Sequence, residues 1–119
     1  MHRPTWVEIN LNALKHNLLA IRKRVGQQIK IMGIVKADAY GHGDYEVSRT
    51  LLNNGVEMLG IAIIEEGIQL REKGIKAPLL LLGGFFDEQI EDIIRYDLTP
   101  IVYDLKLAGL LSEKAVLLN

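Results

Sequence analysis

Short apolar runs that alternate with amphipathic segments constrain this chain more than any other feature of its sequence. Four near-continuous aliphatic runs have the length of strands that are buried on both faces. They occupy residues 29–35, 58–63, 79–82 and 100–103. Each run precedes a segment with helical spacing of apolar residues, at about 44–54, 64–73, 87–95 and 104–113. This βα repeat predicts a parallel sheet with right-handed crossovers.

The first 26 residues predict a strand and a helix ahead of this repeat. Residues 5–10 alternate in polarity, which indicates a short half-buried strand. From Leu11 to Val25, apolar residues recur at spacings of three and four, with Asn10 as the expected N-cap and Gly26 as the stop. Three aspartates are expected to cap later helices: Asp44, Asp87 and Asp104.

Strict βα alternation has two usual architectures, a doubly wound open sheet and a closed eight-stranded barrel. A barrel needs roughly 200 residues or more, and this chain has 119. Two interpretations therefore stand: a complete four-stranded α/β structure, or the first half of a barrel with unpaired strand edges. No linker divides the chain, so residues 1–119 are expected to form one unit. A compact domain of this mass would expose on the order of 6,500 Å².

Composition argues against several classes of protein. Fourteen Lys and Arg balance fifteen Asp and Glu, so we expect no nucleic-acid partner. The chain has no cysteine, which fits a reducing cytoplasm. His2 and His16 are too isolated to form a metal site, so no metal is expected. The N-terminus lacks the apolar stretch of a signal peptide, and the apolar runs are far shorter than the ~18 residues of a membrane span. We therefore expect no membrane insertion.

The first apolar run ends in a segment that indicates chemistry. Lys36 follows the strand at its carboxyl end, where α/β proteins bind their ligands. A partly desolvated amine can act as a base, or it can attack a carbonyl to form a Schiff base. Tyr40 can direct its hydroxyl at the same ligand, Gly41 and Gly43 allow a tight turn, and the next helix N-terminus favours an anion. These residues predict a carbonyl ligand that bears a phosphate.

The nine residues 35–43, V-K-A-D-A-Y-G-H-G, resemble the pyridoxal-phosphate attachment segment of alanine racemases. Residues 6–17, W-V-E-I-N-L-N-A-L-K-H-N, resemble the opening of the same family. Residues 65–75, E-E-G-I-Q-L-R-E-K-G-I, resemble a third family segment, in which Gly67 stands where alanine is commoner. The resemblance extends over essentially the whole chain and favours the barrel interpretation.

That resemblance implies a fold, a cofactor and an activity. Such enzymes have an eight-stranded α/β barrel followed by a β-rich domain and work as dimers, so residues 1–119 would be about the first half of the barrel. Lys36 would bind pyridoxal 5′-phosphate covalently and serve as one of two bases, and Tyr40 would hydrogen-bond the phosphate. The implied reaction interconverts L-alanine and D-alanine for peptidoglycan. The second base, a tyrosine of the partner subunit, would lie outside this chain, which we therefore expect to be a poor racemase alone.

Several residues have a simpler structural interpretation, and two other functions stay open. His42 is expected to form local hydrogen bonds, and Glu65 and Glu66 to complement a helix dipole. Of Phe85 and Phe86, one is expected to pack inward. The alternatives to a racemase are a barrel protein that binds pyridoxal phosphate without catalysis, and an inert half-barrel that associates through its sheet edges. The sequence does not decide between alanine and serine as the substrate.

Overall fold

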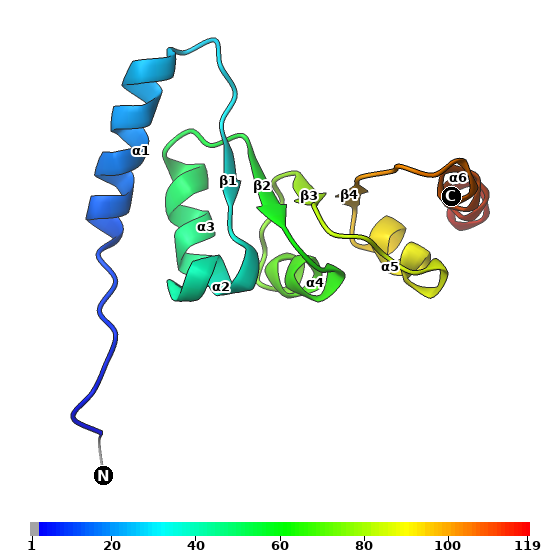
Figure 1. Cartoon of the computed structure of the whole chain (residues 1–119), viewed down its shortest axis with the longest axis horizontal. Coiled ribbons are helices and arrows are strands. Elements are labelled where there is room, and N and C mark those ends of the chain that lie inside the picture. The colour runs from blue at the N-terminus through cyan, green and yellow to red at the C-terminus, as the bar shows by residue number, and fades with distance from the viewer. Residues whose placement is uncertain (1–2) are drawn as a thin grey trace.

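A parallel four-stranded sheet forms the centre of the computed structural model, which describes residues 3–119 (Figure 1). Its strands pair in sequence order, and each pairing is parallel. They are β1 (Met32–Ile34), β2 (Met58–Ile61), β3 (Leu79–Leu81) and β4 (Leu98–Pro100). The predicted βα repeat is confirmed. Strand β4 begins two residues earlier than the sequence indicated, because Leu98 packs inward whereas Ile101 is 41% exposed.

The helices follow the predicted order with one addition, because residues 36–41, which were expected to form a tight turn, are assigned to a helix. They are α1 (Leu11–Val25), α2 (Lys36–Gly41), α3 (Asp44–Asn53), α4 (Ile64–Glu72), the short 3-10 helix η1 (Asp87–Gln89), α5 (Ile90–Arg95) and α6 (Leu105–Leu118). Helix α1 has its predicted ends, because the Asn10 side chain accepts a hydrogen bond from Ala13 N at 3.0 Å and Gly26 follows the last turn. Asp104 caps α6 by accepting from Lys106 N at 2.7 Å. Within residues 3–119, no helix is long and apolar enough to cross a bilayer.

Three predictions about chain segments are wrong. Residues 5–10 are extended but pair with no strand of the described structure, and a local alternation of polarity cannot form a strand without a partner. Asp44 is the first residue of α3 and not its cap, since Gly43 occupies the cap position, and the Asp44 carboxylate lies 3.2 Å from Lys73 Nζ. Asp87 is the first residue of η1, whose N-cap is Phe86. The isolated histidine His2 lies outside the described residues.

The sheet has one covered face and one open face. Helices α3, α4 and α5 pack on the covered face, where four strand residues have no exposed surface: Leu59, Ile61, Leu79 and Leu81. Alternate residues point to the other face. A Cβ added to Gly60 there would meet the side chains of Ile34, Leu82 and Met32. Leu82 is 36% and Met32 is 37% exposed, so this apolar face is largely uncovered.

This one-sided arrangement distinguishes between the two architectures. A doubly wound sheet has helices on both faces and a switch in strand order, whereas this sheet has sequential order and helices on one face. That is the arrangement of a barrel wall. The surface area is 8370 Å², so the expectation of about 6,500 Å² for a compact domain is wrong. The radius of gyration, 16.7 Å, likewise exceeds the roughly 13.5 Å of a compact chain of this length.

Candidate functional site

Lys36 and Tyr40 lie together at the carboxyl end of β1. Val35 N donates to Gly60 O at 2.9 Å, so the pairing of β1 with β2 continues to the residue before Lys36. The Lys36 side chain is half-buried, and its Nζ lies 5.9 Å from the centre of the Tyr40 ring. The Tyr40 side chain is exposed. The structure therefore brings together the two residues that the sequence indicated as candidates.

The backbone that joins these two residues is a left-handed helical turn. Ala37, Asp38, Ala39 and Tyr40 have φ angles of 53°, 56°, 52° and 56°. This region costs an L-residue roughly 1–2 kcal/mol, and glycine is its usual occupant. The sequence indicated only a tight turn here, because four consecutive non-glycine residues give no signal for this conformation.

Hydrogen bonds on both sides fix the left-handed turn. Ala39 N donates to Val35 O at 2.9 Å, and Gly43 N donates to Asp38 O at 2.9 Å. The Asp38 carboxylate accepts from Asp44 N at 2.9 Å and so joins the turn to α3. A strained backbone conformation persists only where several contacts of the surrounding structure fix it. Such conformations are found most often at functional sites.

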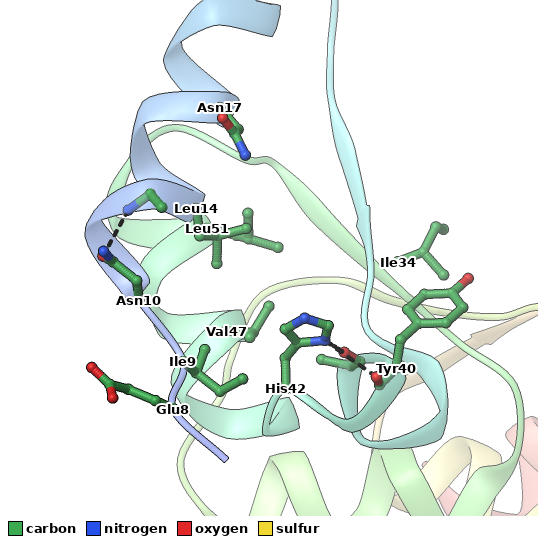
Figure 2. A pocket seen from close by; sticks show the side chains of 12 residues that line it. Glu8, Ile9, Asn10, Leu14, Asn17, Ile34, Tyr40, His42, Val47 and Leu51 are labelled. Atoms are coloured by element: carbon green, nitrogen blue, oxygen red, sulfur yellow. Dashed lines mark hydrogen bonds between the residues drawn. The ribbon is translucent and has the colours of Figure 1, made fainter.

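His42 stabilises the same turn from the other side. Its Nδ1 donates to Ala39 O at 3.0 Å, so the predicted local hydrogen-bonding role is confirmed. Figure 2 shows the imidazole directed back at the turn, while the Tyr40 ring extends on the side of Ile34. A cavity of about 420 Å³ opens between these residues and α1. Tyr40 and Ile34 line this cavity, whereas Lys36 does not.

The Lys36 amine lacks a polar partner. Within residues 3–119 it forms no ion pair or hydrogen bond. Lys73 provides a contrast inside the same molecule. Its Nζ is also 5.9 Å from a tyrosine ring, that of Tyr45, but it is paired with Asp44 at 3.2 Å. No other described residue occupies this amine, so a carbonyl compound can approach it.

Glu66 is the residue that sequence reasoning underestimated. Its Oε1 accepts from Ala37 N at 2.7 Å, and its Oε2 accepts from Ala62 N at 2.7 Å and Ile63 N at 3.2 Å. The sequence predicted only that Glu66 complements the helix dipole, whereas its carboxylate also contacts the turn that follows Lys36. The available signal was its position three residues after the N-cap Ile63, where a glutamate can reach back to the backbone.

The opposite, amino end of the sheet contains an arginine that holds four backbone carbonyls. The Arg71 guanidinium donates to four backbone carbonyls at 2.7–2.9 Å, those of Ile75, Ala77, Tyr96 and Asp97. These residues precede β3 and β4 in the chain. Burial lowers the pKa of Arg71 from its ordinary value, and Asp97 opposes that shift. Arg71 thus joins the entrances of two strands.

Glu57 and Arg22 have the same function at the entrances of β1 and β2. Glu57 accepts from Ile31 N at 2.7 Å and pairs with Arg22 at 3.1 Å. The hydrogen bond from the Ile31 N–H has the largest effect on the pKa of Glu57 and lowers it. Burial opposes this shift, and the charge of Arg22 adds to it. Arg22 also donates to Gly55 O at 2.9 Å and therefore ties α1 to the sheet.

Comparison with known proteins places the chain in a family. A family model described as "Alanine racemase, N-terminal domain" matches residues 9–118. The chain belongs to the alanine racemase family. It is 45% identical to alanine racemase 1 of Caldanaerobacter subterraneus over 117 residues, which are 98% of this chain and 30% of that protein. It is 42% identical to alanine racemase 1 of Bacillus subtilis over 105 residues, or 88% and 27% of the two chains.

Solved structures of alanine racemases have the same fold. The enzyme of Clostridium difficile superposes with a TM-score of 0.95 at 45% identity, covering 99% of this chain and 31% of its own. The enzyme of Bacillus anthracis with bound L-Ala-P superposes with a TM-score of 0.88 at 30% identity. The match covers 96% of this chain and 30% of that enzyme. The barrel-type α/β fold is therefore confirmed. The chain spans about 30% of the length of the curated relatives that it matches.

Proposed function

We propose that this chain provides the cofactor-binding lysine of an alanine racemase, which interconverts L-alanine and D-alanine with pyridoxal 5′-phosphate. The unpaired amine of Lys36 at the carboxyl end of β1 is the observation that supports this most directly. Membership of the alanine racemase family supports the choice of reaction, and the relatives' names favour a racemase over a barrel protein that binds without catalysis.

The residues at the end of β1 fit this cofactor. Lys36 Nζ would hold its aldehyde carbon covalently, and Tyr40 Oη would donate a hydrogen bond to its phosphate. When bound, pyridoxal phosphate supplies an electron sink that weakens the Cα–H bond of an amino acid. Lys36 Nζ would accept the proton from the face of Cα that it approaches. Inversion requires a second proton-transfer group on the opposite face, which we propose lies outside residues 1–119.

We further propose that residues 1–119 form the first half of an eight-stranded barrel that works in a homodimer. The apolar open face of the sheet supports this, because Met32, Ile34 and Leu82 have the character of core residues without cover. In the described structure β1 and β4 each pair on one side, which also permits association through sheet edges. Sedimentation analysis of the chain distinguishes a dimer from a monomer.

A cytoplasmic location stays a prediction.

Reductive labelling tests the cofactor site. The purified chain is mixed with pyridoxal phosphate, its absorption spectrum is recorded, and the adduct is reduced with borohydride and mapped by peptide mass spectrometry. We expect label on Lys36 and little on Lys73, whose amine is occupied by Asp44. Lys36→Met should abolish the site-specific label. Label spread evenly over the lysines would contradict the proposed site.

Deuterium exchange at Cα of alanine separates a racemase from a binding protein without catalysis. The chain loaded with pyridoxal phosphate is incubated with L-alanine in heavy water, beside Lys36→Met. Proton transfer by Lys36 predicts deuterium incorporation above the level of that variant, whether or not D-alanine accumulates. Selective labelling of Lys36 without such incorporation would favour the binding-only function.

A further inference from the structure

Glu66 connects the ends of the two strands that border Lys36. Ala37 follows Lys36 beyond β1, and Ala62 follows the last residue of β2. One carboxylate accepts from both backbone N–H groups at 2.7 Å, although Glu66 lies 29 residues from Ala37 in the chain. Both neighbours of Lys36 are therefore held by a hydrogen bond of their backbone. Val35 N donates to Gly60 O, and Ala37 N donates to Glu66 Oε1.

The capping of α4 alone does not require this arrangement. Oε2 already accepts from Ala62 N and Ile63 N at the start of the helix. Oε1 is the oxygen directed at Ala37, the first residue of the left-handed turn. An ionised carboxylate only accepts hydrogen bonds, so both oxygens can act at once on separate donors. The second contact thus acts on the turn, which needs external support because its conformation is disfavoured.

We propose that Glu66 is a positioning residue for Lys36: it fixes the left-handed turn so that the amine and the Tyr40 hydroxyl are directed at one cofactor, a role that rests on the proposed function. Glu66 touches neither the cofactor nor the substrate in this role. It acts through the backbone of Ala37.

Two substitutions separate positioning from helix capping. In Glu66→Gln one oxygen becomes an NH₂ donor, which cannot face an N–H group. The remaining oxygen should turn to the two donors at the start of α4, and the contact with Ala37 is then lost. Glu66→Ala removes both contacts. Glu65→Gln is the matched control, because Glu65 is exposed and lies in the same helical turn, and its side chain has no hydrogen bond within residues 3–119.

The experiment measures amide hydrogen exchange by NMR and reductive labelling by pyridoxal phosphate on the same four proteins. We expect Glu66→Gln to lower the protection of the Ala37 amide, to leave that of Ala62 in place, and to lower the selective labelling of Lys36 about tenfold, the scale of one charge-assisted hydrogen bond. Glu65→Gln should match the wild type in both measurements. A urea midpoint for each protein confirms that the fold is retained.

Three outcomes would overturn the inference. The first is an unchanged Ala37 amide in Glu66→Ala. The second is wild-type labelling of Lys36 in a variant whose Ala37 amide has lost protection. The third is a wild-type chain in which Lys36 is not labelled, a result that contradicts the proposed function itself and is recognised because it appears without any substitution.

Discussion

The positively charged residues Arg71 and Lys36, at the two ends of the sheet, are held in opposite ways. At the amino end, Arg71 donates to four carbonyls and Arg22 to Gly55 and Glu57. At the carboxyl end, the Lys36 amine has no polar partner within the described residues, and the backbone beside it is left-handed. A cation that holds several backbone carbonyls stabilises the fold, whereas an unpaired cation on strained backbone is free to bind a ligand. The difference indicates that the amino end of the sheet stabilises the fold and that the carboxyl end is the place for ligand binding, as in barrel enzymes generally.

The largest expected effect is at the amino end. Arg71→Lys replaces a planar group with five donors by a single ammonium, so most of the four carbonyls lose their partner. We expect a loss of about 2–3 kcal/mol in the free energy of unfolding, measured by urea denaturation. Arg95→Lys is the control, since that side chain is 63% exposed and should change stability by less than about 0.5 kcal/mol. Equal effects would mean that the four hydrogen bonds of Arg71 contribute no more to stability than one exposed ion pair.

A smaller effect at the same end depends on pH. The pKa of Glu57 is lowered from its ordinary value of 4.5 in the folded chain. Its stabilising contribution is therefore complete above that value and is lost as the pH falls through the lower folded pKa. Glu57→Gln should be less stable than the wild type at about pH 6, and the difference should narrow at about pH 3. A difference that stays constant over this range would show that Glu57 acts without its charge.

The smallest effect on stability is expected at the carboxyl end. Lys36→Met retains most of the unbranched side chain and removes an amine that has no polar partner in the described structure. We expect the free energy of unfolding to change by less than about 0.5 kcal/mol, while selective labelling by pyridoxal phosphate disappears. A loss of 2 kcal/mol or more, on the scale of a buried charge network, would mean that Lys36 is a structural residue.

The sequence predicted the parts of the fold that follow from local pattern. The limits of α1 were predicted from Asn10 and Gly26 because a cap and a stop act within a few residues. The run of four leucines at 79–82 indicated a strand, but it did not indicate which of these leucines are buried under the helices and which are on the open face. Leu79 and Leu81 are fully buried whereas Leu82 is 36% exposed, and that depends on which face the helices cover.

The candidate site was predicted from the place of Lys36 and Tyr40 after a buried strand and from a resemblance, whereas its geometry depends on contacts distant in sequence. Lys36 and Tyr40 were identified from a nine-residue string, and their adjacency is visible in the structure. The left-handed turn between them depends on Glu66 and Asp44, which lie on two other helices. No local pattern in residues 35–43 encodes those partners, so neither the turn nor the role of Glu66 could be predicted from that segment.

The left-handed turn also has a stereochemical consequence. For a residue of D configuration, the region near φ +55° is the favoured helical one. A semisynthetic chain with D-alanine at position 37, where the native side chain is exposed, would adopt the turn by its own preference. The same replacement inside α3 would disrupt a right-handed helix. The backbone beside Lys36 thus has a handedness that its own L-residues oppose, and its shape is imposed by the neighbouring strand and helices.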